Sequence, residues 1–268
     1  MSALRIAVCI KPVPSPDHYH KVGIDPKTRT LVREGIPMVI NPLDKNALEA
    51  ALQIREKCGG EVTVISMAPP AADQNLREAL AMGADRAVLL SDRDFAGSDT
   101  LATSMVLASA IKKLGPFDLV LAGNESADGG TSHVPAQVGE WLGCPHLMHA
   151  CGMEVLEGGQ IKVVTSRDQC RVVYMVRLPA VVSVVRTINR PRFTSLMGVI
   201  SAGKKPLDVY SAPDLPVDEK FLGLGGSPTR AGEIYQPDLT RRCETLEGAA
   251  DEIAGVLLQK FRAAGLQL

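Results

Sequence analysis

Short apolar runs alternate with helix-like segments through the first 142 residues, and this alternation constrains the fold more than any other feature of the chain. Parallel strands that alternate with helices form one sheet, with the crossover helices on its two faces. We therefore predict an α/β fold, a Rossmann-like parallel sheet with helices on both faces. The expected strands are residues 5–10, 62–67, 86–90 and 119–122, and the expected helices are residues 42–57, 71–82, 101–114 and a fourth that begins near Pro135.

A glycine-rich turn follows the last of these strands. The apolar run stops at Gly123, and the polar turn after it contains Gly129, Gly130, Thr131 and Ser132 before the next helix begins. The free N–H groups of such a turn and the dipole of the following helix favour a phosphate. Glycine lets the backbone adopt φ > 0 and approach an oxygen closely. The same residue types also serve as ordinary helix caps, so the turn alone leaves phosphate binding and capping equally open.

A second turn, SDRDFAGSDTLATS, repeats this pattern after the third strand. Thr100, Thr103 and Ser104 fall in the first turns of the helix that follows, where their hydroxyls could reach a nucleotide phosphate. The alternative is that Ser98 or Asp99 caps the helix and Thr103 is packed against its surroundings. This turn also leaves both interpretations open.

The two turns are expected at the same edge of the sheet. In a parallel α/β sheet the ligand crevice lies beyond the carboxyl ends of the strands. Cys9, Met67 and the turns at residues 91–99 and 123–132 all fall there, which favours nucleotide binding. No G-x-G-x-x-G follows the first strand and no G-x-x-x-x-G-K-[ST] occurs, so an ordinary dinucleotide fold and a P-loop are both disfavoured.

Composition excludes several classes of partner. The net charge of -1 over 268 residues gives no electrostatic footprint for nucleic acid. No apolar run approaches the ~20 residues of a membrane span, so we expect no stable membrane insertion. The six cysteines have neither a C-x-x-C pair nor metal-ligand spacing, so we expect reduced thiols and no metal site. The N-terminus, MSALRIAVCIKP, lacks the apolar run of a signal peptide, which favours the cytoplasm of a bacterium or archaeon, or the mitochondrial matrix in a eukaryote.

The pattern changes after Pro145. Residues 153–165 read as a β-hairpin around a Gly-Gly pair, with further strands at residues 171–178 and 180–185. Residues 211–240, rich in Pro and Gly, are expected to form an extended arm, and residues 244–268 an amphipathic helix. We accordingly divide the chain into an α/β nucleotide-binding domain, residues 1–210, and a C-terminal arm and helix, residues 211–268.

Four blocks, in this order, carry a resemblance to a known family. They are NPLDKNALEAAL, ALAMGADRAVLL, the turn and helix at residues 123–139, and LPAVVSVVRTINRPRFTSL with the basic pair Lys204-Lys205 behind it. Together they resemble the β subunit of electron-transfer flavoproteins over essentially the whole chain, whereas any one block alone would be weak. The resemblance implies a heterodimer in which the α subunit holds a redox FAD against this chain. The C-terminal arm and helix would then pack on the α subunit.

The resemblance also implies a function. Electrons would pass through this FAD from a flavoprotein dehydrogenase, such as an acyl-CoA dehydrogenase, to a downstream acceptor. The family's β subunit binds a nucleotide of its own, which is AMP in many members and a second FAD in electron-bifurcating members. If this chain is of the bifurcating kind, it would belong to an NADH-dependent flavin oxidoreductase complex. The positions that match the family's nucleotide site are Cys9, Asn41, Pro42, Leu43, Asp44, Met67, Gly123, Asn124, Glu125, Ser126, Ala127, Asp128, Gly129, Gly130, Thr131, Ser132, His133 and Val134.

The stretch DFAGSDTLATS resembles the second-FAD kind of β subunit, so FAD is favoured over AMP. The resemblance places the hydroxyls of Thr100, Thr103 and Ser104 near the flavin or its phosphates, with Asp99 as a turn or ribose contact. The turn ADGGTSHVPAQVG is similar to the bifurcating pattern but departs from it where Gly130 and His133 replace an acidic residue and a Gln.

The family's segment for docking dehydrogenases matches residues 192–200. Leu196 stands at the place of the inserted apolar anchor, with Arg192 and Met197 in the same segment. We assign no catalytic residue, because in a flavoprotein the redox chemistry belongs to the cofactor. The main alternative function is a non-redox, adenine-nucleotide-binding regulatory module of the universal-stress type. A nucleotide-dependent hydrolase or transferase is a further alternative, but no nucleophile or metal-ligand cluster supports it.

Overall fold

The computed structural model describes residues 3–21, 23–24, 31–32, 35–230, 232 and 243–266. The chain divides into two compact units, Met1–Gly232 and Glu233–Leu268, each of which is described by itself. The first unit is longer than the predicted nucleotide-binding domain, which we expected to end at residue 210. The difference arises because residues 211–227 fold onto the sheet, as described below.

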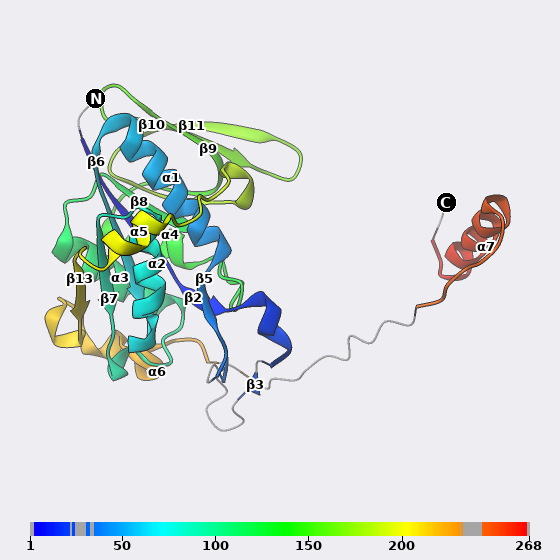
Figure 1. The fold of residues 1–268 in the computed structure, drawn as a ribbon, viewed down its shortest axis with the longest axis horizontal. Coiled ribbons are helices and arrows are strands. Elements are labelled where there is room, and N and C mark those ends of the chain that lie inside the picture. Colours follow the sequence, from blue (N-terminus) through cyan, green and yellow to red (C-terminus); the bar gives the residue numbers. More distant parts are fainter. Residues whose placement is uncertain are drawn as a thin grey trace. The chain divides into compact units, whose positions relative to one another are not determined.

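The first unit is built on a nine-stranded sheet of described residues, in the order β11-β10-β9-β12-β8-β1-β6-β7-β13 (Figure 1). Neighbouring strands from β9 to β13 in this order are parallel, and β10 and β11 extend the sheet as antiparallel strands. The predicted parallel sheet is therefore confirmed, and the predicted hairpin is part of the same sheet. The strands are β1 (Leu4–Cys9), β6 (Gly60–Met67), β7 (Arg86–Leu90), β8 (Leu119–Gly123), β9 (His146–Leu156), β10 (Gln160–Ser166), β11 (Arg171–Arg177), β12 (Ala180–Val184) and β13 (Leu207–Tyr210). Two small ladders pair β2 (Pro12–Pro14) with β5 (Met38–Ile40) and β3 (Gly23–Ile24) with β4 (Leu31–Val32).

Helices cover both faces of the sheet, as predicted. Alternate residues of a strand point to opposite faces. On β1, Ile6 and Val8 join the core beneath α1 (Pro42–Cys58) and α2 (Asp73–Met82), whereas Ala7 and Cys9 join the core beneath α3 (Thr100–Leu114) and α4 (Val134–Leu142). The start of α1 follows from its sequence, because Asn41 occupies the N-cap and Pro42 the first helical position.

Residues 211–227 are more folded than the extended arm that we predicted. The apolar side chains of Ala212, Leu215 and Leu222 are buried in the core beneath α3 and α4, so this segment covers the sheet beside β13. Residue 231 and residues 233–240 of the predicted arm lie outside the described residues. The remaining short helices of this unit are η1 (Pro16–Lys21), η2 (Pro70–Ala72), η3 (Arg93–Phe95), η4 (Arg186–Ile188), α5 (Leu196–Ala202), η5 (Ala212–Asp214), η6 (Glu219–Phe221) and α6 (Gly223–Gly226).

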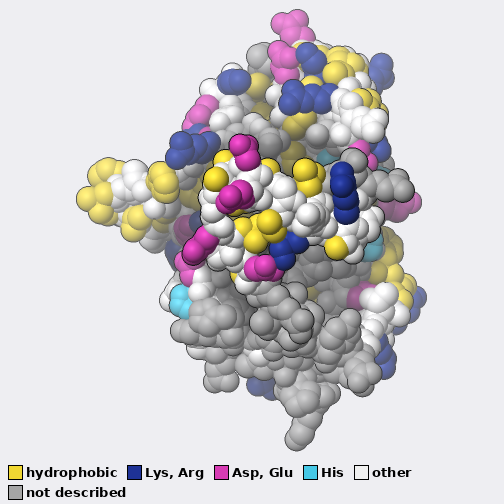
Figure 2. Space-filling model, turned by 90° about the vertical axis from the view of Figure 1, so that its right-hand side faces the viewer, with side chains coloured by type: hydrophobic (Ala, Val, Ile, Leu, Met, Phe, Trp, Pro, Cys, Tyr) yellow, Lys and Arg dark blue, Asp and Glu magenta, His cyan; other side chains and the backbone are white. Residues whose placement is uncertain are grey.

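The second unit contains the terminal helix, α7 (Ala250–Ala263), which begins at Ala250 rather than at residue 244 as predicted. Val256, Leu257, Leu258 and Phe261 are exposed in this unit taken by itself. No helix in the described part of the chain is both long enough and apolar enough to cross a membrane. Among the coloured side chains in Figure 2, basic and acidic groups are interspersed and neither sign dominates.

Candidate functional site

A buried carboxylate joins three segments at the carboxyl edge of the sheet. Asp44, in the first turn of α1, accepts hydrogen bonds from the backbone N–H of Lys11 at 2.8 Å and from that of Gly123 at 2.9 Å. A Cβ added at Gly123 would lie 2.4 Å from Oδ1 of Asp44 and 2.7 Å from Cβ of Leu43. Only glycine therefore allows the end of β8 to approach α1 so closely.

Side chains of two residues that precede α1, Asn41 and Lys11, contact the turn after β8. Nδ2 of Asn41 donates to the carbonyl oxygen of Glu125 at 2.8 Å, and its Oδ1 accepts from the backbone N–H of Ala127 at 3.1 Å. Nζ of Lys11 lies 2.6 Å from Oδ1 of Asp128, which is almost fully buried. The structure thus brings the predicted residues Asn41, Asp44 and the 123–128 turn into direct contact.

The same turn is tied on its other side to β12. Asn124 donates its backbone N–H to the carbonyl oxygen of Val184 at 3.0 Å, and its side-chain Oδ1 accepts from the hydroxyl of Ser183 at 3.2 Å. Nδ2 of Asn124 donates to Oγ of Ser132 at 3.3 Å, and the Ser132 hydroxyl in turn donates to Oε2 of Glu125 at 3.0 Å. Ser132 has φ = 56°, a left-handed conformation that is uncommon outside glycine. These contacts fix the backbone conformation of the turn.

From Gly129 onwards, the turn is open to solvent at the start of α4. Gly129, Gly130, Thr131 and His133 are all exposed. Gly130 has φ = +57°, and a Cβ added there would meet no atom within 4 Å. His133, at the N-cap, makes no side-chain capping bond, so the first N–H groups of α4 have no side-chain partner there. An uncapped N-terminus beside open space is an anion-binding arrangement.

The N-terminus of α3, by contrast, is capped by the side chain of Asp99. Oδ1 of Asp99 accepts from the backbone N–H groups of Leu101 at 3.0 Å and Ala102 at 3.1 Å, while its Oδ2 accepts from the backbone N–H and hydroxyl of Thr229. Burial opposes the charged form, but the hydrogen bonds from Thr229 and from the two helical amides outweigh it, so the pKa of Asp99 lies below its ordinary value. Asp99 therefore acts as the cap that our alternative interpretation described.

Polar side chains link α3 and α4 side by side. The hydroxyl of Ser104 is fully buried, donates to the carbonyl oxygen of Leu101 and accepts from Nε1 of Trp141 at 3.1 Å. It is thus held between the two helices and away from the exposed edge. One turn closer to the N-termini, Nε2 of Gln137 donates to the hydroxyl of Thr100 at 3.4 Å, while Oε1 of Gln137 is buried with no hydrogen-bond partner among the described residues.

The other predicted nucleotide contacts line the same region. Cys9 is buried on the α3 and α4 side of the sheet; burial, with the charge of Asp44, raises the pKa of its thiol to about 12, so the thiol stays protonated. Met67 packs half-buried against the same core, and Thr103 is half-buried on α3. Burial raises the pKa of Asp44 to about 7, although hydrogen bonds from Lys11, Asn41 and Gly123 and the charge of Lys11 work against this.

We did not predict two residues of this region from the sequence. Lys11 follows β1 directly, and the edge rule that selected Cys9 should have included it. Gln137 lies one turn inside α4, where the sequence offers only an ordinary polar helix residue. The uncapped start of α4 and the open backbone at Gly130 fit a phosphate, and the unpartnered Oε1 of Gln137 is an acceptor that a hydroxyl or amino group of a nucleotide would satisfy.

The predicted docking residues lie elsewhere, on and before α5. Leu196 and Met197 are 77% and 73% exposed, and the hydroxyl of Ser195 caps the helix. Lys205 turns inward, because its Nζ donates to two carbonyl oxygens at the C-terminal end of α2. Arg192 also turns inward, towards α1.

Comparison with known proteins identifies the family. A model described as the electron transfer flavoprotein domain matches residues 28–215. The chain is 42% identical to the electron transfer flavoprotein subunit beta of Thermoanaerobacterium thermosaccharolyticum, covering 97% of this chain and 98% of that protein. It is 41% identical, over 97% and 98% of the two chains, to the Caffeyl-CoA reductase-Etf complex subunit CarD of Acetobacterium woodii, and 39% identical, over 87% and 85%, to the protein FixA of Azorhizobium caulinodans. The chain therefore belongs to the electron transfer flavoprotein β-subunit family.

Proposed function

We propose that this chain is the β subunit of a heterodimeric electron carrier. Its α subunit would hold a redox FAD against it, and a second nucleotide would bind the chain itself at the N-terminus of α4. The observation that carries the nucleotide site is the uncapped start of α4 beside the unpartnered Oε1 of Gln137. A bound flavin would supply the one-electron or hydride chemistry, and the chain would supply position and hydrogen bonds.

Within this site, we place the phosphates at α4 rather than at α3. A phosphate at the start of α3 would meet the negative carboxylate of Asp99, which already occupies the amides of Leu101 and Ala102. At α4 the dipole is free to favour negative charge. Of the three hydroxyls expected near the nucleotide, those of Thr100 and Thr103 remain candidates, whereas that of Ser104 is held between Trp141 and Leu101.

The nucleotide is proposed to be FAD rather than AMP. The stretch DFAGSDTLATS favours FAD, and a 41% identical relative is named as a subunit of a Caffeyl-CoA reductase-Etf complex. Acid release of the nucleotides from the purified heterodimer, followed by quantification of FAD and AMP, tests the assignment. Two FAD per heterodimer would support it. One FAD with one AMP would instead identify an ordinary carrier, and no nucleotide beyond the shared FAD would refute the site at α4.

The proposed docking surface for a flavoprotein dehydrogenase is the apolar face of α5. Leu196, Met197, Val199 and Ile200 are all more than half exposed on this short helix. A cluster of exposed apolar side chains is typical of a protein interaction site. A leucine inserted into a partner's pocket would act as an anchor residue, whose truncation weakens binding.

Leu196→Ala is therefore expected to raise the KM for the reduced dehydrogenase about tenfold, as loss of one anchor of ~1.4 kcal/mol does. Flavin content should stay unchanged, because α5 packs on α2 and no hydrogen bond among the described residues joins it to the nucleotide-binding turn. Val209→Ala is a matched control, since Val209 is also more than half exposed but lies on β13. Equal transfer kinetics in the Leu196 and Val209 variants would remove the docking assignment.

The alternative, a non-redox module of the universal-stress type, is not favoured. The family match and the full-length relatives are those of electron transfer flavoproteins. A colourless chain with no affinity for a flavin-binding partner would reopen that alternative.

A further inference from the structure

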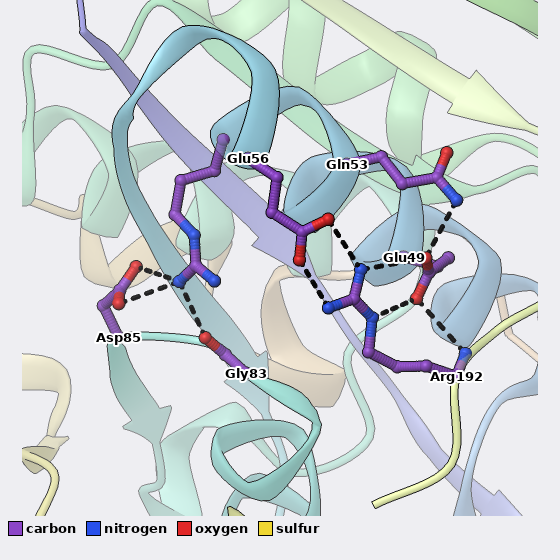
Figure 3. A network of polar contacts seen from close by, with 7 residues as sticks. Glu49, Gln53, Glu56, Gly83, Asp85 and Arg192 are labelled. Carbon is purple, nitrogen blue, oxygen red and sulfur yellow. Dashed lines mark hydrogen bonds and ion pairs between the residues drawn. The ribbon is translucent and has the colours of Figure 1, made fainter.

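Arg192 is enclosed by two carboxylates of α1. Its Nε and Nη2 donate to the two carboxylate oxygens of Glu49 at 2.7 and 3.1 Å, and its Nη1 and Nη2 donate to the two oxygens of Glu56 at 2.6 and 3.2 Å (Figure 3). The backbone N–H of Arg192 also donates to Glu49. Two bidentate pairs on one guanidinium fix both its position and its orientation.

This network is partly buried, which distinguishes it from an exposed surface ion pair that contributes little to stability. The side chain of Glu49 is only 5% exposed, and its carboxylate also accepts from Nε2 of Gln53. The side chain of Glu56 is 48% exposed and completes the outer half of the pair. The hydrogen bond from Arg192 lowers the pKa of Glu56, and so favours the charged form of this carboxylate.

A second contact holds the same segment three residues earlier. Nδ2 of Asn46 donates to Oδ1 of Asn189 at 2.9 Å, and Nδ2 of Asn189 donates back to the carbonyl oxygen of Asn46 at 2.9 Å. The chain that leads into α5 is therefore attached to α1 at Asn189 and again at Arg192.

The other end of α5 is attached to α2. Nη1 of Arg77 donates to the carbonyl oxygen of Ala202 at 3.1 Å. A Cβ added at Gly198 would lie 2.3 Å from the carbonyl oxygen of Ala81, so the backbone of α5 rests directly on α2. Both ends of the docking helix are thus held by the two helices that cover this face of the sheet.

This support matters because α5 has little stability of its own. A helix of seven residues is too short to persist in isolation, and most of its apolar side chains face solvent instead of a core. Its conformation must therefore come from contacts on its inner side and at its ends. Ordering the helix before the partner arrives removes that entropic cost from the binding step.

We propose that Arg192, clamped by Glu49 and Glu56, is a positioning residue that presets the docking helix, and that its guanidinium is not itself a contact of the partner. The proposal rests on the function proposed above, in which α5 docks a dehydrogenase. It changes the role expected for Arg192 from the sequence, where its place in the docking segment suggested direct contact.

The test uses the intact heterodimer and four variants: Arg192→Gln, Glu56→Gln, Arg190→Gln and Leu196→Ala. Arg190 is the matched control, since it is exposed, carries the same charge two residues away and forms no ion pair within the described part of the chain. Hydrogen exchange of peptides covering residues 193–203 reports the order of the docking helix. Steady-state kinetics with the reduced dehydrogenase report docking.

Arg192→Gln is expected to speed exchange in this peptide and to raise the KM about tenfold, with kcat and flavin content unchanged. Glu56→Gln should act in the same direction with a smaller effect, because it leaves the inner pair with Glu49 intact and no buried charge unpaired. It also keeps the test decisive if Arg192→Gln does not fold. Arg190→Gln should match the wild type.

Exchange and KM in Arg192→Gln and Glu56→Gln that equal those of Arg190→Gln would overturn the positioning role. Faster exchange with an unchanged KM in Arg192→Gln, where Leu196→Ala does raise the KM, would overturn it as well, because the order of α5 would then not matter to docking. Failure of the proposed function looks different: Leu196→Ala would leave the KM unchanged while exchange in Arg192→Gln still rises.

Discussion

The N-termini of α3 and α4 lie side by side, and a similar run of Gly, Ser, Thr and Asp precedes each, yet only the first has a side-chain cap. At α3, Asp99 caps the helix and also binds Thr229, so the terminus is filled by the chain itself. At α4 the N-cap residue, His133, makes no such bond, and the backbone at Gly130 is open. One terminus therefore stabilises the fold, and the other is available to a ligand.

Two carboxylates near these termini, Asp99 and Asp44, have pKa values that are shifted in opposite directions. Asp99 is partly solvated and accepts several hydrogen bonds, so its pKa is lowered. Asp44 is fully buried, and desolvation raises its pKa to about 7 in spite of its hydrogen bonds. A carboxyl whose pKa is higher in the folded than in the unfolded state stabilises the fold at low pH, and one whose pKa is lower stabilises it at higher pH. The two groups therefore make the free energy of unfolding depend on pH with opposite signs. Substituting each carboxylate separately tests whether their contributions to stability have opposite signs.

Asp44→Asn should have the largest effect on pH dependence. Because the folded-state pKa lies above the ordinary carboxyl value, the contribution of Asp44 is fully present below about pH 4 and is lost as the pH rises through about 7, a change of up to about 4 kcal/mol. The difference between wild type and variant in urea denaturation of the heterodimer, measured from pH 4 to pH 8, isolates this contribution. A wild-type advantage that grows with pH would mean that the pKa of Asp44 is lowered instead.

Asp99→Ala should cost about 1–2 kcal/mol of unfolding free energy, the usual loss for a helix cap, and should leave the bound nucleotide in place. Its stabilisation is present at neutral pH and lost as the pH falls below the ordinary carboxyl range, because its pKa is lowered. Asp94→Ala is the control, since the Asp94 carboxylate accepts no hydrogen bond from the described residues. Urea denaturation and nucleotide content per heterodimer are the two measurements.

The reverse result is expected at α4. Gln137→Ala should reduce nucleotide content, because it removes the unpartnered Oε1, while changing stability little. If Asp99→Ala loses the nucleotide and Gln137→Ala keeps it, the nucleotide binds at α3 and our assignment of the two termini is wrong.

The parts of the fold that the sequence predicted have local signals. Asn41-Pro42 marks the start of α1, and the β-rich run at Arg86–Leu90 matches β7 residue for residue. The edge rule for parallel sheets also grouped Cys9 with the turn that begins at Gly123, whereas Asn41 and Asp44, which the structure joins to this turn by hydrogen bonds, were grouped with it by the family resemblance. Such signals act over a few residues or follow from topology, so a single sequence contains them.

The roles of Asp99 and Arg192 could not be predicted from the sequence, because each depends on a partner that is distant along the chain. Asp99 accepts a hydrogen bond from Thr229, 130 residues away, and Arg192 donates to Glu49, 143 residues away. Nor does composition reveal that residues 211–227 fold onto the sheet, since a Pro- and Gly-rich segment is also typical of an extended arm. Its few apolar residues, among them Leu215 and Leu222, are what bury it.

The smallest expected effect tests the contact that joins the two helices. Ser104→Ala removes the acceptor for Nε1 of Trp141, which should cost about 1 kcal/mol of unfolding free energy, the usual net value of one hydrogen bond. Ser109→Ala is the matched control, because Ser109 is also buried on α3 and its hydroxyl makes no hydrogen bond within the described residues. Since Ser104 is buried between α3 and α4, the nucleotide should be retained in full. Loss of nucleotide without loss of stability would instead show that this hydroxyl reaches the ligand, and that α3 contributes to the site after all.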